Sequence, residues 1–441
     1  MRPAAGEPLE VVIEEIGARG DGIARRGAER VFVPLALPGD RLRVRIGGRR
    51  GDGLVGEPVE RLEQAPRTEP PCPHFGACGG CQLQHLPAAE YRAWKREQVV
   101  AALARHGLRD IAVAPLASTA PGGRRRARLA FVREGGAIRL GFRQRTGHRV
   151  VAVRTCPVLA PELVALLPPL GDLLGRLDLA RGGGEVELTA SATGIDLLVV
   201  APAVPGLCDR ETLARFADGH DLARISWAPA AKAEAEPIAE RRKPSVAFDQ
   251  VRVAPPPRAF LQATTAAEVV IRRAIGEAIG RARHIADLFA GCRTFALPLA
   301  AGGGTVHAVE AEPAMLGALR RAARDAGLAA RVTTEVRDLQ VAPLAGAEIE
   351  RFEAVVVDPP HAGARAQAAA LAAAGPGRLA MVSCNPATFA RDARLLVAGG
   401  YRCLWVQPVD AFLWSSRIEL IAAFARAAGA PSKPCRSRSE G

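Results

Sequence analysis

Two short motifs near the carboxyl end contain side chains that could form and break covalent bonds. Cys384 lies in SCNP after the apolar run LAMV, and Asp358 lies in DPP after the apolar run AVVV. Each run predicts a buried strand, and because the carboxyl ends of parallel strands meet at one sheet edge, we expect both side chains there. A helix beginning near Thr388 would lower the pKa of the Cys384 thiol and favour a reactive thiolate. An inert buried thiol is the weaker alternative, because polar residues and a proline flank Cys384.

The segment 285–300, IADLFAGCRTFALPLA, predicts a cofactor-binding loop. Its pattern indicates a buried strand, a tight turn at Gly291 and a helix beginning near Thr294. In a doubly wound sheet the loop after the first strand binds the ligand, because glycine permits a close approach and the helix offers free N–H groups. The residues that we expect around this ligand are Asp287, Phe289 and Gly291.

Two carboxylates follow the next two predicted strands. Glu310 ends GTVHAVE, where it could accept hydrogen bonds from ribose hydroxyls, and Asp338 follows RVTTEV, where it could contact an adenine. The pattern fits a nicotinamide dinucleotide nearly as well as S-adenosylmethionine. The absence of a strict G-x-G-x-x-G motif argues against the dinucleotide, and a solvated carboxylate without a ligand remains the alternative for Glu310.

Three of the nine cysteines, Cys72, Cys78 and Cys81, lie together in PCPHFGACGGC. An odd number of cysteines argues against a disulfide framework and favours metal or catalytic use. Three thiolates at this spacing can surround one metal centre, and Cys156 in RTCP is the best candidate for a fourth ligand. Four thiolates suit zinc or an iron–sulfur cluster, and the spacing does not separate the two.

The elements that must position these residues change in kind along the 441-residue chain, which predicts an α/β protein of several domains. Residues 1–63 contain short strands and glycine or proline turns, typical of a five-stranded OB-like barrel that binds RNA or of a purely structural barrel. Residues 64–249 predict a central α+β domain, with an irregular stretch at 231–244. Residues 250–426 alternate strands with helices, which predicts a doubly wound, Rossmann-like sheet. The basic tail 427–441 is expected to be disordered.

The net charge of +13 favours a polyanionic partner, because phosphate neutralisation dominates nucleic-acid affinity. A general bias of the composition toward arginine would give the same surplus. No apolar run reaches the ~18–20 residues that cross a bilayer, and the first residues lack the apolar core of a signal peptide. We expect a monomeric, cytoplasmic protein that binds a nucleic acid and no membrane.

A set of motifs resembles those of one enzyme family. The chain is similar to the RNA uracil C5-methyltransferases that carry an N-terminal TRAM domain and a [4Fe–4S] cluster, and among them to the bacterial enzymes acting on 23S ribosomal RNA. The resemblance covers about residues 8–426 and includes, in the family's order, PCPHFGACGGC, LGFR, CPVLAP, FLQ, DLFAG, DPP and SCNP. DLFAG alone is not specific, whereas the set is.

The resemblance implies a site and a mechanism. It implies a [4Fe–4S] cluster on the four cysteines, and S-adenosylmethionine contacted by Gln262, Glu310 and Asp358. Cys384 matches the nucleophile, whose attack on C6 of the uracil lets C5 take a methyl group. Glu419, in SSRIELIAAFAR, matches the base that then removes the C5 hydrogen.

Three positions depart from the family pattern. Arg293 stands where glycine is usual, His361 where arginine is usual, and Arg417 where histidine is usual. If Arg293 needed a positive φ, it would be strained and could crowd the cofactor. Arg293 motivates one alternative, an RNA-binding factor that has lost catalysis. A transfer-RNA uridine C5-methyltransferase is a second alternative, against which the barrel and the cysteine cluster argue.

Overall fold

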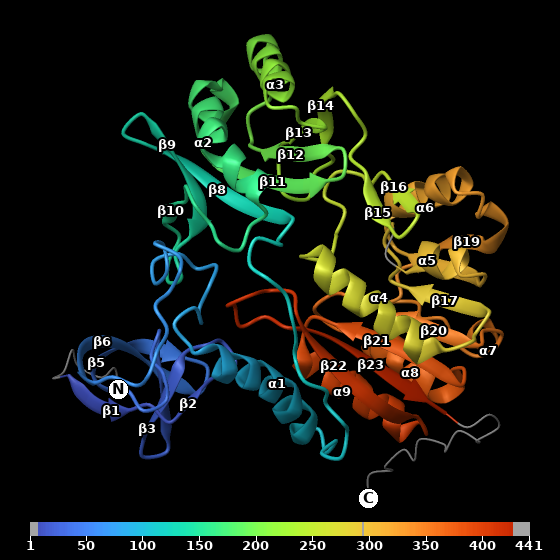
Figure 1. Ribbon diagram of the computed structural model, residues 1–441, viewed down its shortest axis with the longest axis horizontal. Coiled ribbons are helices and arrows are strands. Elements are labelled where there is room, and N and C mark those ends of the chain that lie inside the picture. Colours follow the sequence, from blue (N-terminus) through green and yellow to red (C-terminus); the bar gives the residue numbers. More distant parts are fainter. Residues whose placement is uncertain (1–7, 293–294, 427–441) are drawn as a thin grey trace, which may run out of the picture.

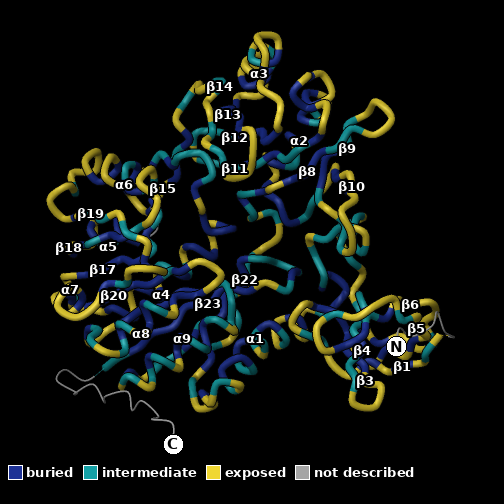
Figure 2. Tube along the Cα trace, turned by 180° about the vertical axis from the view of Figure 1, so that it is seen from behind, coloured by how far each residue is buried: buried dark blue, intermediate teal, exposed yellow. Residues whose placement is uncertain are grey.

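The computed structural model describes residues 8–292 and 295–426, and Figure 1 shows three units, each with its own sheet. The N-terminal unit is blue, the central unit is green, and the C-terminal unit runs from yellow to red. Figure 2 shows that buried residues gather inside each unit, whereas exposed residues lie mainly in loops and on the outer helices. Within the described ranges, no helix has the length and apolar character needed to cross a membrane.

The N-terminal unit is a six-stranded sheet around a small apolar core that includes Val31, Leu42 and Val44. Its order is β1-β5-β6-β4-β3-β2, and the sixth strand beyond the expected five is the two-residue β2. Register shifts between β5 and β6 bend the long hairpin, as bulges do. The strands are β1 (Leu9–Val12), β2 (Glu15–Ile16), β3 (Gly22–Arg26), β4 (Glu29–Val33), β5 (Arg41–Arg50) and β6 (Gly53–Glu63).

The central unit is a seven-stranded sheet of order β10-β9-β8-β11-β12-β13-β14. Leucines at helical spacing in α2 and apolar residues of α3 cover one face of it. The elements are β8 (Arg126–Glu134), β9 (Ala137–Arg143), β10 (Val150–Ala152), α2 (Pro161–Arg176), a 3-10 turn (Asp178–Ala180), β11 (Gly184–Ser191), β12 (Gly194–Val200), α3 (Leu207–Gly219), β13 (Arg224–Ala228) and β14 (Glu236–Glu240).

The expectation of an irregular stretch at 231–244 was wrong in part, because β14 lies within it. β14 pairs with β13 across a register shift and contains Pro237. An edge strand tolerates a proline, since one side of its backbone needs no partner. The proline and the irregular alternation of apolar and polar residues are therefore the reason that this strand was not predicted.

The C-terminal unit confirms the expected doubly wound sheet. Its order is β19-β18-β17-β20-β21-β23-β22-β7, with β17 to β21 parallel and β23 antiparallel to both neighbours. Helices α4, α5 and α6 share one apolar core with the sheet, and α1, α8 and α9 share the other. The strands are β17 (His284–Leu288), β18 (Thr305–Glu310), β19 (Val332–Val336), β20 (Ala354–Val357), β21 (Arg378–Ser383), β22 (Arg402–Asp410) and β23 (Glu419–Ala425). The helices are α4 (Thr265–Ile279), α5 (Ala296–Ala301), α6 (Pro313–Asp325), the short α7 (Ala347–Glu350), α8 (Arg365–Ala374) and α9 (Pro386–Ala398), with a 3-10 turn at Ala329–Arg331.

Helix α1 (Ala88–Arg105) and strand β7 (Ala117–Ser118) lie with the C-terminal sheet, although we expected them in the central α+β unit. Val99 and Leu103 of α1 are buried in the same core as Phe389 of α9, and β7 pairs with β22. The β15–β16 hairpin (Val246–Phe248 and Val251–Val253) also shares a core with this unit. Segments from before residue 250 therefore pack with the C-terminal unit, although their local sequence patterns suggested the central unit.

Candidate active site

The carboxyl edge of the C-terminal sheet brings three reactive side chains together. Asp358 follows the last residue of β20, and Cys384 follows the last residue of β21, its parallel neighbour. β23 runs antiparallel to β21 with Leu420 opposite Ser383, so Glu419 at its start lies beside Cys384. The reversed last strand is the reason that a carboxylate from the end of the chain reaches this edge.

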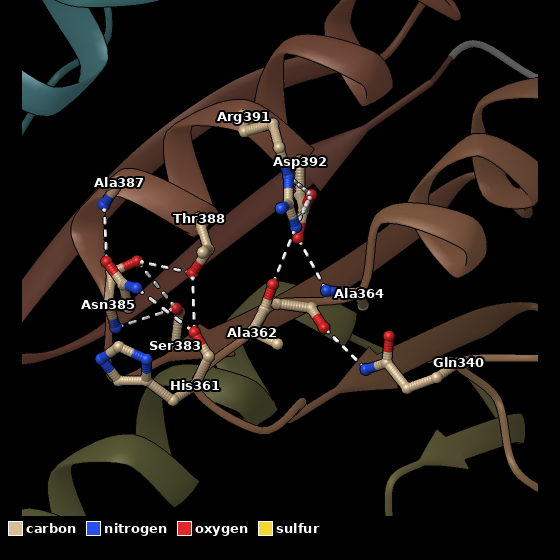
Figure 3. A network of polar contacts seen from close by, with 11 residues as sticks. Gln340, His361, Ala362, Ala364, Ser383, Asn385, Ala387, Thr388, Arg391 and Asp392 are labelled. Carbon is tan, nitrogen blue, oxygen red and sulfur yellow. Dashed lines mark hydrogen bonds and ion pairs between the residues drawn. The ribbon is translucent and has the colours of Figure 1, made fainter.

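Hydrogen bonds connect the loop after the DPP motif to helix α9, which follows Cys384 (Figure 3). The Asn385 side chain donates to the carbonyl of His361 at 3.2 Å and also caps α9. The buried carboxylate of Asp392 accepts the N–H of Ala364 at 2.8 Å. The two loops are thereby fixed against each other, which fixes the separation of their reactive side chains.

Cys384 is a half-buried thiol whose pKa is raised to about 11. Burial is the largest cause and the charges of Glu419 and Asp358 add to it, whereas a backbone hydrogen bond and the charge of Arg417 act in the opposite direction. The expectation of a lowered pKa was therefore wrong, because the helix start is outweighed by burial and two carboxylates. The first helical residue is also Pro386, which offers no N–H. The thiol must lose its proton as it attacks.

Glu419 is a buried carboxyl with only 2% of its surface exposed. Burial and the neighbouring charge of Asp358 raise its pKa to about 8. A general base is most effective when its pKa is close to the working pH, and the pKa of Glu419 is close to neutral pH. The side chain is therefore suited to take up and release a proton.

The loop after β17 is a tight turn fastened to the end of β18. Phe289 and Gly291 both have a φ of 60°, and such strain at a residue with a side chain concentrates at binding sites. The Glu310 carboxylate accepts the N–H of Gly291 at 2.9 Å, of Ala311 at 2.8 Å and of Glu312 at 3.1 Å. Glu310 thus joins the two loops, and its remaining lone pair, on Oε2, can accept a further hydrogen bond.

Gln262 presents a buried acceptor beside helix α4. The side chain is 1% exposed, and its Oε1 finds no hydrogen-bond donor among the described residues. Its backbone carbonyl accepts the Nε–H of Arg125 at 3.1 Å, and Thr264 caps α4 two residues later. An unpaired buried acceptor costs about 1–3 kcal/mol, so this oxygen points to a donor on a bound molecule.

The other residues assigned to the cofactor have different surroundings. Asp287 is fully buried within β17, whereas Asp338 is exposed and its Oδ1 accepts the N–H of Gln340 at 2.9 Å. The expected helix start near Thr294 and the departure at Arg293 lie outside the described residues, and α5 begins at Ala296.

Four cysteines surround one cavity of about 720 Å³ between the three units; they are Cys72, Cys78, Cys81 and Cys156. All four are free thiols, and burial together with the charges of the other three raises the pKa of Cys81 to about 12. In the part of the chain that the structure describes, no three His, Cys, Asp or Glu side chains converge in the way that one metal ion requires. The four cysteines that the sequence suggested as ligands thus line the same cavity, and their role as ligands of a metal centre stays a prediction.

The arginine run near residue 124 is largely structural. Arg125 is buried and paired with the fully buried Glu268 of α4, so it holds the segment that carries Gln262. Arg128 and Arg143, which are more exposed, both pair with Glu185. These pairs reduce the positive charge that the run offers to RNA.

A buried polar cluster near the site was not expected from the sequence. Lys95 of α1 and Asp410 of β22 form an ion pair with no exposed side-chain surface, and the Tyr91 hydroxyl donates to Asp410 at 2.7 Å. Tyr91, Lys95, Val99 and Leu103 follow one another at intervals of four residues, so a lysine within an apolar helical stripe was the available signal.

Comparison with known proteins finds relatives along nearly the whole chain. An uncharacterized RNA methyltransferase of Mesorhizobium japonicum is 41% identical over 410 residues, covering 93% of this chain and 96% of the relative. The 23S rRNA (uracil(1939)-C(5))-methyltransferase RlmD of Halomonas elongata is 35% identical over 436 residues, covering 93% and 88%. None of the protein-family models compared matches the chain.

Among solved structures, the Pyrococcus abyssi tRNA (uracil-54, C5)-methyltransferase in complex with S-adenosyl-L-homocysteine superposes with a TM-score of 0.75. The match covers 95% of this chain and 99% of that one at 23% sequence identity. At this identity the match shows a shared fold and nothing more.

Proposed function

The chain belongs to the RNA methyltransferase family of these relatives, and on that premise we propose that it methylates C5 of a uridine in RNA with S-adenosylmethionine. The observation that carries the proposal is the pairing of β21 with β23, which sets Glu419 beside Cys384 at the edge where Asp358 also lies. A nucleophile and a base at one point are what addition to C6 and later elimination require.

The first half of the reaction belongs to Cys384. C5 of uracil is a poor nucleophile. As the thiol passes its proton to water, its sulfur bonds to C6, which turns C5 into the nucleophilic carbon of an enolate. The cofactor supplies the electrophilic methyl group that C5 then takes. With a thiol pKa of about 11, the proton must leave during attack, and the positive charge of Arg417 favours that loss.

The second half belongs to Glu419. After methylation C5 carries both a methyl group and a hydrogen. The Glu419 carboxylate removes that hydrogen, the electrons of the C–H bond form the C5=C6 double bond, and the sulfur of Cys384 leaves with its electron pair. Asp358 lies close enough for its charge to raise the pKa of both groups, so it tunes this exchange and could hold the uracil edge.

The residues near the loop after β17 suit S-adenosylmethionine. The buried Oε1 of Gln262 can accept from an ammonium or amino group, and the Glu310 carboxylate can accept from ribose hydroxyls. Phe289 and Gly291 shape the turn, and we assign Asp287 and Asp338 as further neighbours of the cofactor. Loss of any one of these contacts would weaken cofactor binding before it changes the chemistry.

We also propose that the four cysteines hold a [4Fe–4S] cluster. The four cysteines line one cavity, and four thiolates are the usual ligands of such a cluster. The choice of iron–sulfur over zinc rests on the resemblance of the cysteine motif to that of the family. The N-terminal sheet, as a TRAM-like unit, would bind the RNA that flanks the target base.

Ribosomal RNA is the proposed substrate. The Halomonas relative, named for 23S ribosomal RNA, is 35% identical, and the Pyrococcus structure, named for transfer RNA, is 23% identical. The greater similarity favours ribosomal RNA, while the transfer-RNA enzyme is the second candidate because its fold matches over 95% of this chain.

The test is mass spectrometry of ribosomal and transfer RNA from a strain that lacks this gene. We expect 5-methyluridine to disappear from one site of 23S ribosomal RNA and to return with the intact gene. Loss from transfer RNA would instead support the second candidate. No loss from either RNA, with RNA binding by the purified protein intact, would leave an RNA-binding factor with impaired catalysis.

A further inference from the structure

The loop 411–418, here called the base loop, joins β22 to β23 and ends directly before Glu419. Trp414 within it has a φ of 57°, which is strained for a residue with a side chain. Such strain persists only where the surroundings determine the conformation. The contacts that hold this loop therefore decide where the adjacent carboxyl lies.

Helix α1 holds the base loop from one side. The buried ammonium of Lys95 donates to Asp410 at 2.7 Å, to the carbonyl of Phe412 at 3.2 Å and to the carbonyl of Arg417. The Tyr91 hydroxyl donates to Asp410 at 2.7 Å and accepts the N–H of Trp414 at 2.8 Å. The strained residue and the one two positions before Glu419 are both bonded to α1.

The irregular segment 72–83, here called the cysteine turn, holds the same loop from the other side. The N–H groups of Gln82 and Leu83 donate to the carbonyl of Trp414 at 2.8 and 3.0 Å. The side-chain oxygen of Gln82 accepts the N–H of Ser416 at 3.1 Å, while its nitrogen donates to the carbonyl of Gly79 at 2.8 Å. Gly79 lies between Cys78 and Cys81, so one side chain joins the cysteine turn to the base loop.

We infer that Gln82, Tyr91 and Lys95 are positioning residues for Glu419, and that the cysteine turn acts on catalysis through Gln82. This inference rests on the proposed uridine methylation. None of the three side chains needs to touch the uracil, because each acts through the backbone of the base loop. Misplacing a catalytic group by about 1 Å can cost roughly 100-fold in rate, so small shifts of this loop matter.

The role of Glu419 makes the inference specific to one step. If the carboxyl is misplaced, Cys384 can still bond to C6 and C5 can still receive its methyl group. The C5 hydrogen is then removed slowly, so the C6–S bond persists and protein remains attached to methylated RNA. A loosened base loop therefore predicts accumulation of this adduct relative to released product, which a general loss of stability does not.

Two mild variants test this, because removing Lys95 would leave Asp410 buried and unpaired and could unfold the protein. Gln82→Met keeps the length of the side chain and removes both of its hydrogen bonds, and Tyr91→Phe removes one hydroxyl. The chain offers matched controls: Gln367→Met breaks the same kind of bonds to Leu344, and Tyr401→Phe breaks one to Pro376, each away from the base loop.

Hydrogen exchange of segment 411–419 and the ratio of denaturation-resistant adduct to released 5-methyluridine are measured on each protein, together with its iron content. We expect Gln82→Met and Tyr91→Phe to exchange faster in this segment and to raise the adduct ratio on the order of tenfold. The two controls should match the unmodified protein, and Gln82→Met should keep its iron.

Folded variants with unchanged exchange, or with faster exchange and an unchanged adduct ratio, would overturn the inference. Should the unmodified protein make neither adduct nor 5-methyluridine, the proposed function itself fails. The exchange data alone would then show whether these bonds fix the loop.

Discussion

The two groups of reactive residues are built in different ways. At the sheet edge, Asp358, Cys384 and Glu419 are placed by the ends and the register of paired strands. Around the cavity, three thiols come from an irregular turn and the fourth, Cys156, from a loop of the central unit. The first site is a property of one sheet, whereas the second exists only where three units meet.

The difference predicts different responses to change. A side chain replaced at the sheet edge should alter chemistry while the fold itself is kept, because the backbone register remains. A thiol removed from the cavity should alter folding or the packing of the units, because irregular segments there have few other restraints. The base loop, which contacts both regions, should show a mixture of the two effects.

The largest expected effect is on catalysis alone. Cys384→Ala removes the nucleophile, so methyl transfer to RNA should fall by about 10⁴-fold or more, while the melting temperature stays close to that of the unmodified protein. Cys208→Ala, at an exposed thiol on α3, is the control and should leave both unchanged. Activity within tenfold of normal in Cys384→Ala would remove the thiol from the mechanism.

Replacing a cysteine of the cavity should instead lower the stability of the protein. Cys81→Ser removes one proposed cluster ligand, so bound iron should be lost and the free energy of unfolding should fall by about 3–5 kcal/mol, as expected for loss of a metal centre. Iron analysis and denaturant unfolding measure both quantities. An iron-free but fully stable Cys81→Ser protein would show that the units do not depend on the cluster.

The buried carboxyl of Glu419 predicts that stability depends on pH in a particular direction. Its pKa is raised to about 8 in the folded protein, so the folded state keeps a proton that the unfolded chain releases above its ordinary pKa of 4.5. Its contribution to stability therefore falls as pH rises from about 4.5 and becomes constant above about 8. Glu419→Gln has no such proton to lose.

We expect Glu419→Gln to gain stability over the unmodified protein as pH rises, reaching a few kcal/mol near pH 9. Denaturant unfolding at pH 5, 7 and 9 measures this difference. A difference that stays constant across these values would mean that Glu419 is not a buried carboxyl with a raised pKa.

The smallest effect is expected at the exposed Arg417. Its charge lowers the pKa of Cys384, so Arg417→Ala should move thiolate formation to higher pH and slow alkylation of Cys384 less than tenfold, since solvent screens the exposed guanidinium. Peptide mass spectrometry after timed alkylation measures the rate at this thiol. Faster alkylation in the variant would contradict the assigned direction.

The sheet edge could be predicted from the sequence because its signals are local. The apolar runs before Asp358 and Cys384 predicted strands, and alternation with helices predicted a doubly wound sheet, as observed. The pKa of Cys384 was predicted in the wrong direction, because it depends on burial and on carboxylates from other strands. The residues next to Cys384 in the sequence indicate the start of the helix, but they do not indicate the carboxylates, which come from other strands.

Other features depend on contacts between distant segments. Helix α1 was assigned by its place in the chain, yet its apolar stripe packs on the C-terminal sheet. Lys95 in that stripe has its partner, Asp410, more than 300 residues away. The sequence motif FLQ marked Gln262, but only the folded structure shows that no donor among the described residues reaches its side-chain oxygen.

The most direct test of the account is a trapped intermediate. Glu419→Gln is incubated with undermethylated ribosomal RNA and labelled S-adenosylmethionine, denatured, digested and analysed by mass spectrometry. The account predicts a peptide containing Cys384 bonded through sulfur to a uridine that carries one labelled methyl group. A labelled methyl group on RNA without this bond, or a bond at any other residue, would contradict it.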